Sequence, residues 1–336
     1  MALLIMLVSL TGTFLVWKQQ YLWLVIPQAR VEFIPTPESL SIIAEAIDRQ
    51  FDGNEILSVQ FASQELPLTL LTLSDERFAY LDTQGSIVDQ WQGNGRFEEW
   101  VYDLHHRLLL GDTGLNIVGT GAMIMVLLAL FGMIAYWPFR KGFRLGLLLR
   151  SLGRAHLLLA HRNLGIVVLL PFLLTLVTGI VLVYPAQTEA WLLDDMRRTE
   201  QYSNTLTEHL DDISGGGSGD WLPAMQRAVA VFPDAIIRSA QVPGSFSGYR
   251  IIGLQQNGEW SRQGLSRVYI DSEQGYMDIR MDALRYPLIE RIYNTVVPLH
   301  TGKMNSLVYK LWLTMVGLGI FALSTMGLTG FVKKYL

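Results

Sequence analysis

The chain contains no cysteine, and only 17% of its 336 residues are charged, against 50% that are hydrophobic. Without cysteine there can be no disulfides, thiolate metal sites, iron–sulfur clusters or covalently attached c-type haem. Any redox centre must therefore be held by histidine or methionine, or be loosely bound. The sequence also lacks a nucleotide-binding glycine motif, a P-loop, HExxH and GxSxG, so it gives no sign of an NAD(P)H or flavin site.

Soluble domains average about 25% charged residues, and long apolar stretches account for the lower fraction here. We predict four membrane-spanning helices, near residues 3–26, 115–137, 163–185 and 308–332. Each is close to the ~20 residues that a helix needs to cross the hydrocarbon core. The first stretch follows no basic segment and precedes no small-residue cleavage site, so we expect a retained helix rather than a signal peptide.

The charges of the connecting segments predict how the chain is oriented in the membrane. Residues 137–162 carry six Arg or Lys and no acid, whereas residues 28–103 carry fourteen acids and four bases. Residues 186–299 carry fifteen acids and ten bases. The positive-inside rule places the short basic loop and the C-terminus in the cytoplasm. The two larger segments are then expected outside, in the periplasm of a Gram-negative cell, with the protein in the inner membrane.

The sequence contains one unit twice, in the order helix, outer domain, helix. LTGTFLVW in the first predicted span resembles VTGIVLVY in the third, and aligning Gly12 with Gly179 gives an offset of 179 − 12 = 167 residues. The second helix of each half opens with Leu-His, at His105 and at His300, an offset of 300 − 105 = 195. Such repeats determine the architecture, so we expect an internally duplicated fold.

Each outer segment shows an amphipathic helix followed by strand-like runs. Apolar spacing predicts a helix at 38–50 in the first segment, and in the second we expect Asp220 to cap a helix that reaches Phe232. Strands are predicted at 56–62, 67–73 and 77–82, and at 235–242, 248–255 and 266–271. The third run of each set leads into a Gly-containing turn. We therefore expect two small helix-plus-sheet domains that pack together as a pseudo-symmetric pair.

These patterns resemble two related sequence families. An amphipathic helix and strands ending in AYLDTQGSIV (79–88) or VYIDSEQGYM (268–277) resemble the PepSY domain. LHHRLLLGDTG (104–114), the HRNLG…TG pattern (161–179) and PLHTGK (298–303) resemble the PepSY-associated transmembrane family. The resemblance spans essentially the whole chain. The PepSY-associated transmembrane family includes inner-membrane siderophore reductases that carry b-type haem, and this chain looks similar to them.

The resemblance implies an α-helical membrane protein: a four-transmembrane-helix bundle with two periplasmic α+β PepSY-like domains, internally duplicated. The expected parts are transmembrane helix 1 (1–27), the first PepSY-like domain (28–103), transmembrane helix 2 (104–139), a basic cytoplasmic loop (140–160), transmembrane helix 3 (161–185), the second PepSY-like domain with a Gly/Ser-rich insertion at 214–219 (186–299), and transmembrane helix 4 with a cytoplasmic tail (300–336).

Five of the six histidines lie near the ends of predicted membrane helices, where imidazole is a good axial ligand for haem iron. Because His105 and His300 are equivalent in the repeat, we predict that they bind one haem b iron from opposite faces. The alternative is that both contact lipid headgroups or cap helices. His106 lies about 100° further around its helix, so we expect it, with Arg107, to contact the surroundings of the haem. His209, in the polar insertion, is expected to be solvated.

The inner side of the membrane offers a second site. His161 matches a family position for a second haem, and we predict it as the ligand there, so one haem is expected and two are allowed. Its repeat partner would fall at 161 − 167 = −6, before Met1. Either the chain begins at an internal Met or the partner is replaced. His156 lies five residues earlier, on what we predict to be the same helix. It is retained as a ligand candidate, with a plain interfacial polar residue as the alternative.

Three functions compete at this point. The leading hypothesis is a haem b electron conduit that reduces a ferric siderophore or another iron chelate on the periplasmic side and releases Fe(II). Its electrons would come from a cytoplasmic or quinone donor, and its other partner is the lipid bilayer, with no nucleic acid. The second is a haem-free PepSY module that binds or inhibits a periplasmic protease or partner. The third is a general membrane cytochrome subunit.

Overall fold

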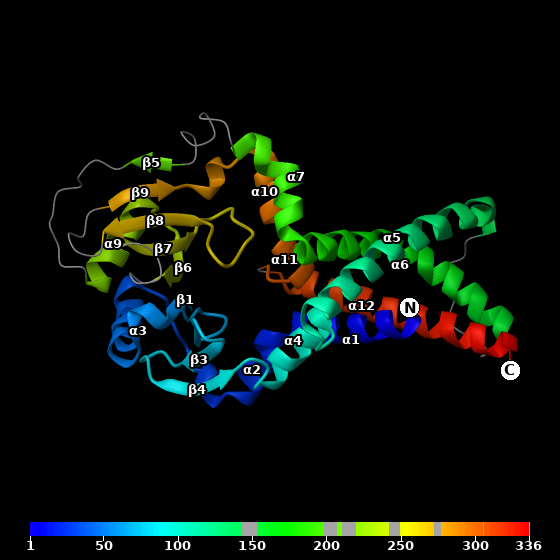
Figure 1. The fold of residues 1–336 in the computed structure, drawn as a ribbon, viewed down its shortest axis with the longest axis horizontal. Helices are drawn as coiled ribbons and strands as arrows, with labels where there is room; N and C mark the ends of the chain where they lie inside the picture. The colour runs from blue at the N-terminus through cyan, green and yellow to red at the C-terminus, as the bar shows by residue number, and fades with distance from the viewer. Residues whose placement is uncertain are drawn as a thin grey trace. The chain divides into compact units, whose positions relative to one another are not determined.

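The computed structural model describes residues 1–142, 153–197, 207–209, 220–241, 249–271, 277–304 and 306–335 (Figure 1). Expectations for residues 143–152 of the basic loop, for the 214–219 tract and for the second Gly-containing turn concern residues outside these ranges. The chain forms two compact units. The helical unit comprises Met1–Lys18, Phe97–Thr188 and Val296–Leu336, and the sheet unit comprises Gln19–Arg96 and Glu189–Thr295.

The helical unit consists of long apolar helices and two short ones that precede them. Its helices are α1 (Ala2–Val16), α4 (Phe97–Arg107), α5 (Gly111–Tyr136) with η3 (Trp137–Gly142), α6 (Arg154–Val183), α11 (Val296–Thr301) and α12 (Leu307–Tyr335). Within the described residues, Gly111–Lys141, Arg154–Val183 and Leu307–Tyr335 are long and apolar enough to cross a membrane. The predicted second, third and fourth spans are therefore confirmed as helices of spanning length.

The predicted first span is not one helix. It breaks at Trp17 into α1 and α2 (Lys18–Val25), which are bent by 62°, so the pair counts as a fourth span only as a broken one. The reason lies in what α2 packs against. Leu22 and Ile26 are 2% and 5% exposed and join Tyr80 and Trp91 in an apolar cluster of the sheet unit. Leu22 and Ile26 thus bury against protein, although the apolar residues between them, Trp23 to Val25, are exposed.

The sheet unit contains one nine-stranded sheet in the order β4-β3-β2-β1-β6-β7-β8-β9-β5. Its strands are β1 (Ile56–Gln60), β2 (Thr69–Leu73), β3 (Arg77–Leu81), β4 (Ile87–Gln92), β5 (Thr207–His209), β6 (Ile236–Gln241), β7 (Tyr249–Gln255), β8 (Ser266–Asp271) and β9 (Met277–Met281). All six predicted strands are present. The remaining helices are η1 (Pro27–Arg30), α3 (Pro37–Gln50), η2 (Gly53–Glu55), α7 (Pro185–Arg197), α9 (Trp221–Val231), η4 (Ala283–Arg285) and α10 (Leu288–Asn294).

The two outer segments share this sheet instead of forming two separate sheets. β1 pairs antiparallel with β6, where Val59 faces Ala240 and Gln60 faces Ser239. We had expected two domains packed side by side. Backbone pairing of β1 with β6 instead satisfies the N–H and C=O groups that two isolated sheets would each leave open at an edge.

Strand alternation gives the first half of the sheet two apolar faces. On β3, Ala79 and Leu81 belong to the main core, in which α3 and α9 also pack, whereas Tyr80 belongs to the cluster around α2. Successive strand residues point to opposite faces, so this half is covered on both sides. Helix α3 starts with a capping box between Thr36 and Ser39. Asp220 occupies the N-cap of α9 as predicted, but its side chain makes no capping hydrogen bond to that described helix.

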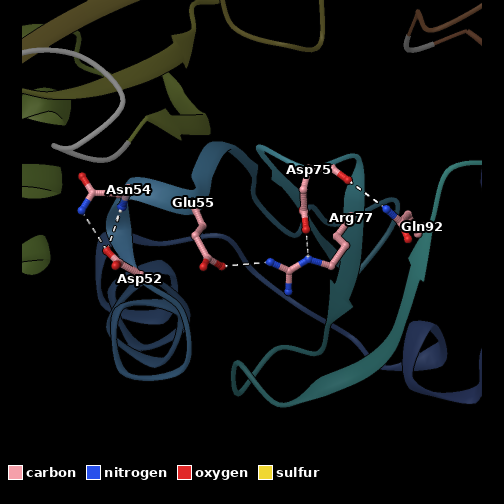
Figure 2. Close-up of polar contacts among 6 residues, drawn as sticks. All are labelled: Asp52, Asn54, Glu55, Asp75, Arg77 and Gln92. Carbon is pink, nitrogen blue, oxygen red and sulfur yellow. Dashed lines mark hydrogen bonds and ion pairs between the residues drawn. The ribbon is translucent and has the colours of Figure 1, made fainter.

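Polar contacts fix the turns at one end of strands β1 to β4. Figure 2 shows Arg77 between two carboxylates, with its guanidinium 3.0 Å from Glu55 and 2.5 Å from Asp75. The backbone carbonyl of Asp75 accepts a hydrogen bond from the Gln92 side chain at 3.2 Å. These exposed contacts connect β3 to the turn before it and to β4, and they contribute little energy individually.

Candidate functional site

The two histidines that the repeat pairs lie on short helices just before the spans. His105 belongs to α4, and Leu108, Leu109 and Gly111 then have φ values of 52°, 60° and 56°. His300 belongs to α11, which is followed by Gly302 with a φ of 69°. A left-handed residue ends a helix, so neither histidine is on the membrane helix itself. The prediction that each histidine opens a membrane helix is therefore wrong. Each is held on a separate turn beside it.

The fold brings these two side chains together. The ring centroids of His105 and His300 are 6.3 Å apart, with the ring planes tilted by 51°. Both side chains are half-buried within the helical unit. Residues 195 positions apart in sequence therefore face one another across a gap between α4 and α11.

Each imidazole rests on one turn of a long helix. The Nδ1 atom of His105 lies 3.0 Å from the carbonyl oxygen of Val8 and 3.1 Å from the hydroxyl of Thr11, both on α1. The Nδ1 atom of His300 lies 3.0 Å from the hydroxyl of Thr178 on α6. The contacts on α6 follow those on α1 at the sequence offset of 167.

A glycine next to each threonine makes room for the ring. A Cβ atom built on Gly12 would lie 2.8 Å from Cε1 of His105, and one built on Gly179 would lie 3.1 Å from Cε1 of His300. Both distances are shorter than an ordinary van der Waals contact. The Thr-Gly pair thus forms a seat: the threonine hydroxyl contacts Nδ1, joined at His105 by the carbonyl oxygen of Val8, and the missing side chain of the glycine admits the ring.

The seats determine which ring nitrogen is free. A carbonyl oxygen can only accept a hydrogen bond, so Nδ1 of His105 carries the proton and Nε2 keeps its lone pair. For His300, the hydroxyl of Thr178 donates to carbonyl oxygens of its own helix and therefore accepts from Nδ1. A histidine that binds a metal through one nitrogen characteristically donates the other N–H to such a partner. Both rings are therefore in the tautomer required of a ligand.

The spacing of the rings fits one metal ion between them. A ring nitrogen lies about 1 Å from its centroid and a metal–imidazole bond is about 2 Å long, so two axial imidazoles place their centroids about 6 Å apart. The observed separation is 6.3 Å. Within the described residues no group of three or more His, Asp or Glu could hold a metal ion. A pair of histidines suits a haem, because the macrocycle supplies the other ligands to the iron.

His161 occupies a related position elsewhere in the helical unit. Its Nδ1 atom lies 2.9 Å from the carbonyl oxygen of Leu323 on α12, and its Cε1 atom lies 3.6 Å from a Cβ built on Gly327. The repeat aligns Gly327 with Gly132 on α5, since 327 − 132 = 195. Among the described residues, no atom lies within 4 Å of a Cβ built on Gly132.

The other predicted residues lie apart from these seats. His106 stacks on Tyr102 of the same helix, with ring centroids 5.5 Å apart. His156 is exposed and lies on α6 together with His161, as predicted for one helix. His209 ends β5, and its side chain is outside the described part of the chain.

The sequence reasoning missed Thr11 and Thr178. Their signal was present, because both glycines in the aligned LTG and VTG motifs follow a threonine. A hydroxyl that contacts a histidine 94 or 122 residues away cannot be recognised without the fold. Gly119 and Gly317 likewise admit neighbouring side chains, Tyr184 and Thr13 respectively, and so serve helix packing.

Fold and site together define a multi-pass membrane protein with a large extramembrane sheet and paired histidines beside its membrane helices. The chain belongs to the family of the PepSY-associated TM region, whose model matches residues 1–334. A comparison with curated proteins gives no match.

Proposed function

We propose that this protein is a haem b electron-transfer protein of the bacterial inner membrane that reduces a ferric siderophore or another iron chelate on the periplasmic side. The observation that carries the proposal is the pair formed by His105 and His300, whose rings are 6.3 Å apart on equivalent Thr-Gly seats. A haem bound there supplies one-electron transfer. With both axial positions taken by histidine, no position remains for oxygen.

The residues around the pair support electron transfer rather than ligand exchange. Each imidazole is held at Nδ1 by a threonine hydroxyl, and His105 also by the carbonyl oxygen of Val8. Each ring also lies against a glycine without space for further movement toward the helix. Rings held in this way keep the same geometry whether they bind ferric or ferrous iron. Little rearrangement is then needed when the electron arrives or leaves, as preorganised sites achieve generally.

His161 supports a path across the membrane. It lies 179 − 161 = 18 residues before Gly179 on α6, which is about 27 Å along a helix. The hydrocarbon core is about 30 Å thick. A second iron held by His161 would therefore lie near the cytoplasmic side, while the His105–His300 pair lies near the periplasmic side.

Reduction is a sufficient way to release iron from a chelate. One electron converts Fe(III) to Fe(II), whose smaller charge gains less from hard oxygen ligands. The outer segments carry 29 acids and 14 bases in total, a balance that favours cationic species such as released Fe(II) over anionic ones. The electron comes from a reduced quinone or a cytoplasmic reductase.

The proposal is tested by absorption spectra of the purified protein before and after dithionite. We expect a b-type haem spectrum, and we expect His105→Ala and His300→Ala each to remove the same haem. The double variant should lose no more than either single one, because both ligands serve one iron. His106→Ala is the matched control and should keep most of that haem.

Each contrary outcome has a distinct meaning. A protein without haem would reject the proposal and favour a PepSY module that binds a periplasmic protease or partner. Haem without reduction of any ferric chelate would favour a general cytochrome subunit. Unchanged haem content in both single variants would remove His105 and His300 from the site.

A further inference from the structure

We propose that Thr11 and Thr178 are positioning residues that set the reduction potential of the iron held between His105 and His300. This inference rests on the proposed haem site and assigns a role to two residues that touch only its ligands. It follows from the direction of the threonine hydrogen bonds on the two seats. It also follows from the seat of His161, where the described residues include no threonine in contact with the ring.

The hydroxyl hydrogens of both threonines are already committed. Thr11 donates to the carbonyl oxygens of Leu7 and Val8 at 2.9 and 3.1 Å, both on its own helix. A threonine hydroxyl has one hydrogen and two lone pairs. The oxygen of Thr11 therefore meets Nδ1 of His105, 3.1 Å away, as an acceptor.

Thr178 repeats this arrangement on α6. It donates to Leu174 and Thr175 at 2.8 and 3.1 Å, and its oxygen lies 3.0 Å from Nδ1 of His300. Each outer imidazole thus has a threonine hydroxyl as acceptor for its N–H, and His105 also has the carbonyl oxygen of Val8. At His105 the backbone acceptor alone fixes the tautomer, so the hydroxyl is a second acceptor beyond what the tautomer requires.

The seat of His161 provides a comparison within the same chain. It has the backbone acceptor, Leu323, and the glycine, Gly327, but Met326 stands where the outer seats have threonine. The neighbouring Thr325 donates to Phe321 on its own helix at 2.9 Å. A backbone acceptor and a glycine are therefore enough to seat a histidine. The hydroxyl is an addition confined to the outer pair.

A second acceptor at Nδ1 increases the electron density at Nε2. A more basic ligand stabilises ferric iron more than ferrous iron, because the higher charge gains more from it. Partners of this kind typically change metal affinity by about 10- to 100-fold, and at His105 one acceptor, the carbonyl oxygen of Val8, remains after the hydroxyl is removed. We therefore expect each threonine to strengthen the ferric preference about tenfold, which corresponds to about 59 mV in a one-electron potential.

The test uses the full-length protein, purified in detergent with its haem. Thr11→Val and Thr178→Val keep the shape of the side chain and remove the hydroxyl. Each should retain the haem and raise its midpoint potential by about 59 mV, and the double variant by about twice that, because the two hydroxyls act on different ligands. Thr11→Ser and Thr178→Ser restore the hydroxyl and should restore the potential.

Thr325→Val is the matched control, since it removes the same type of intrahelical hydrogen bond from a threonine whose hydroxyl contacts neither His105 nor His300. The midpoint potential of the haem in this variant should equal that in the unmodified protein. Midpoint potentials of the Thr11 and Thr178 variants that match this control would overturn the proposal. So would potentials that change in the valine variants but are not restored by serine.

A second measurement separates failure of this inference from failure of the proposed function. In haem-free protein labelled with ¹⁵N at histidine, His105 and His300 should show protonated Nδ1, and each Thr→Val variant should shift the Nδ1 resonance of its own histidine only. Protein that never binds haem but shows these shifts would reject the proposed function and retain the contact. Unshifted Nδ1 resonances would reject the positioning role whether or not haem is bound.

Discussion

Replacing Gly12 by alanine places a methyl group against the ring of His105. The added Cβ would lie 2.8 Å from Cε1, whereas ordinary contacts begin at 3.4 Å, so the ring must retreat by at least 3.4 − 2.8 = 0.6 Å. The same change at Gly179 demands 3.4 − 3.1 = 0.3 Å from His300. Functional sites tolerate displacements of about 0.5 Å. We therefore expect Gly12→Ala to lose most of the outer haem and Gly179→Ala to weaken it less.

The helix itself should tolerate both substitutions. Alanine is favoured over glycine inside a helix by about 1 kcal/mol, and overpacking costs about 1–3 kcal/mol. The net loss of stability in Gly12→Ala is then at most about 2 kcal/mol, too little to account for loss of haem by unfolding. Gly132→Ala is the matched control, because among the described residues no atom lies within 4 Å of its Cβ.

The assay compares haem content per protein, from the reduced-minus-oxidised spectrum, with thermal unfolding of the same samples. Gly132→Ala should keep full haem content and gain up to about 1 kcal/mol of stability. Full haem content in Gly12→Ala would refute the reasoning, because the ring could then not occupy the position described. Equal losses in Gly12→Ala and Gly132→Ala would show that the effect is not local to the seat.

Three further predictions concern the sheet unit and the topology. Leu22→Ala should destabilise the full-length protein by about 2–5 kcal/mol in chemical denaturation, because this side chain is 2% exposed; a change below about 1 kcal/mol would argue against the packing of α2. Burial alone would raise the pKa of Glu65, but Arg262, 3.6 Å away, lowers this pKa below its ordinary value of 4.5. The ionised carboxylate therefore stabilises the fold above pH 4.5, and this stabilisation is lost as the pH falls through the folded pKa. Glu65→Gln should therefore flatten the acid limb of a stability–pH curve by less than about 1 kcal/mol, and an unchanged curve would count against it. In this cysteine-free chain, a cysteine at Gln84 should react with an impermeant reagent in intact cells and one at Lys141 only after rupture, and the reverse pattern would invert the topology.

The sequence was sufficient to predict the long helices and the strands because both depend on local patterns. Uncharged runs of about 20 residues identify spans, and alternation identifies half-buried strands. The break at Trp17 was not predictable in this way. Residues that bury against a sheet and residues that bury in lipid are equally apolar, so Leu22 and Ile26 extended the first predicted span. The pairing of β1 with β6 depends on backbone groups, which carry no sequence signal.

The part of the candidate site that the repeat aligns was predictable. The repeat aligned His105 with His300 and Gly12 with Gly179, and the structure brings each histidine to the glycine of its own half. It could not indicate that the imidazoles stand on separate short helices, because the left-handed conformation of Leu108 and Leu109 is unusual for leucine. Whether the pair binds haem stays a prediction.

The arrangement of the halves explains how one site can form from two copies of the same unit. Each half supplies one histidine of the pair and its seat, so the proposed iron site can form only when both halves are assembled. Helix α1, which seats His105, also contacts α12 of the other half: Trp17 donates to the hydroxyl of Thr314 at 2.8 Å, and Thr13 packs where Gly317 has no side chain. His300 lies on α11, directly before α12. Contacts on one helix therefore hold the first ligand and position the helix that follows the second, which makes the separation of the two rings a property of helix packing.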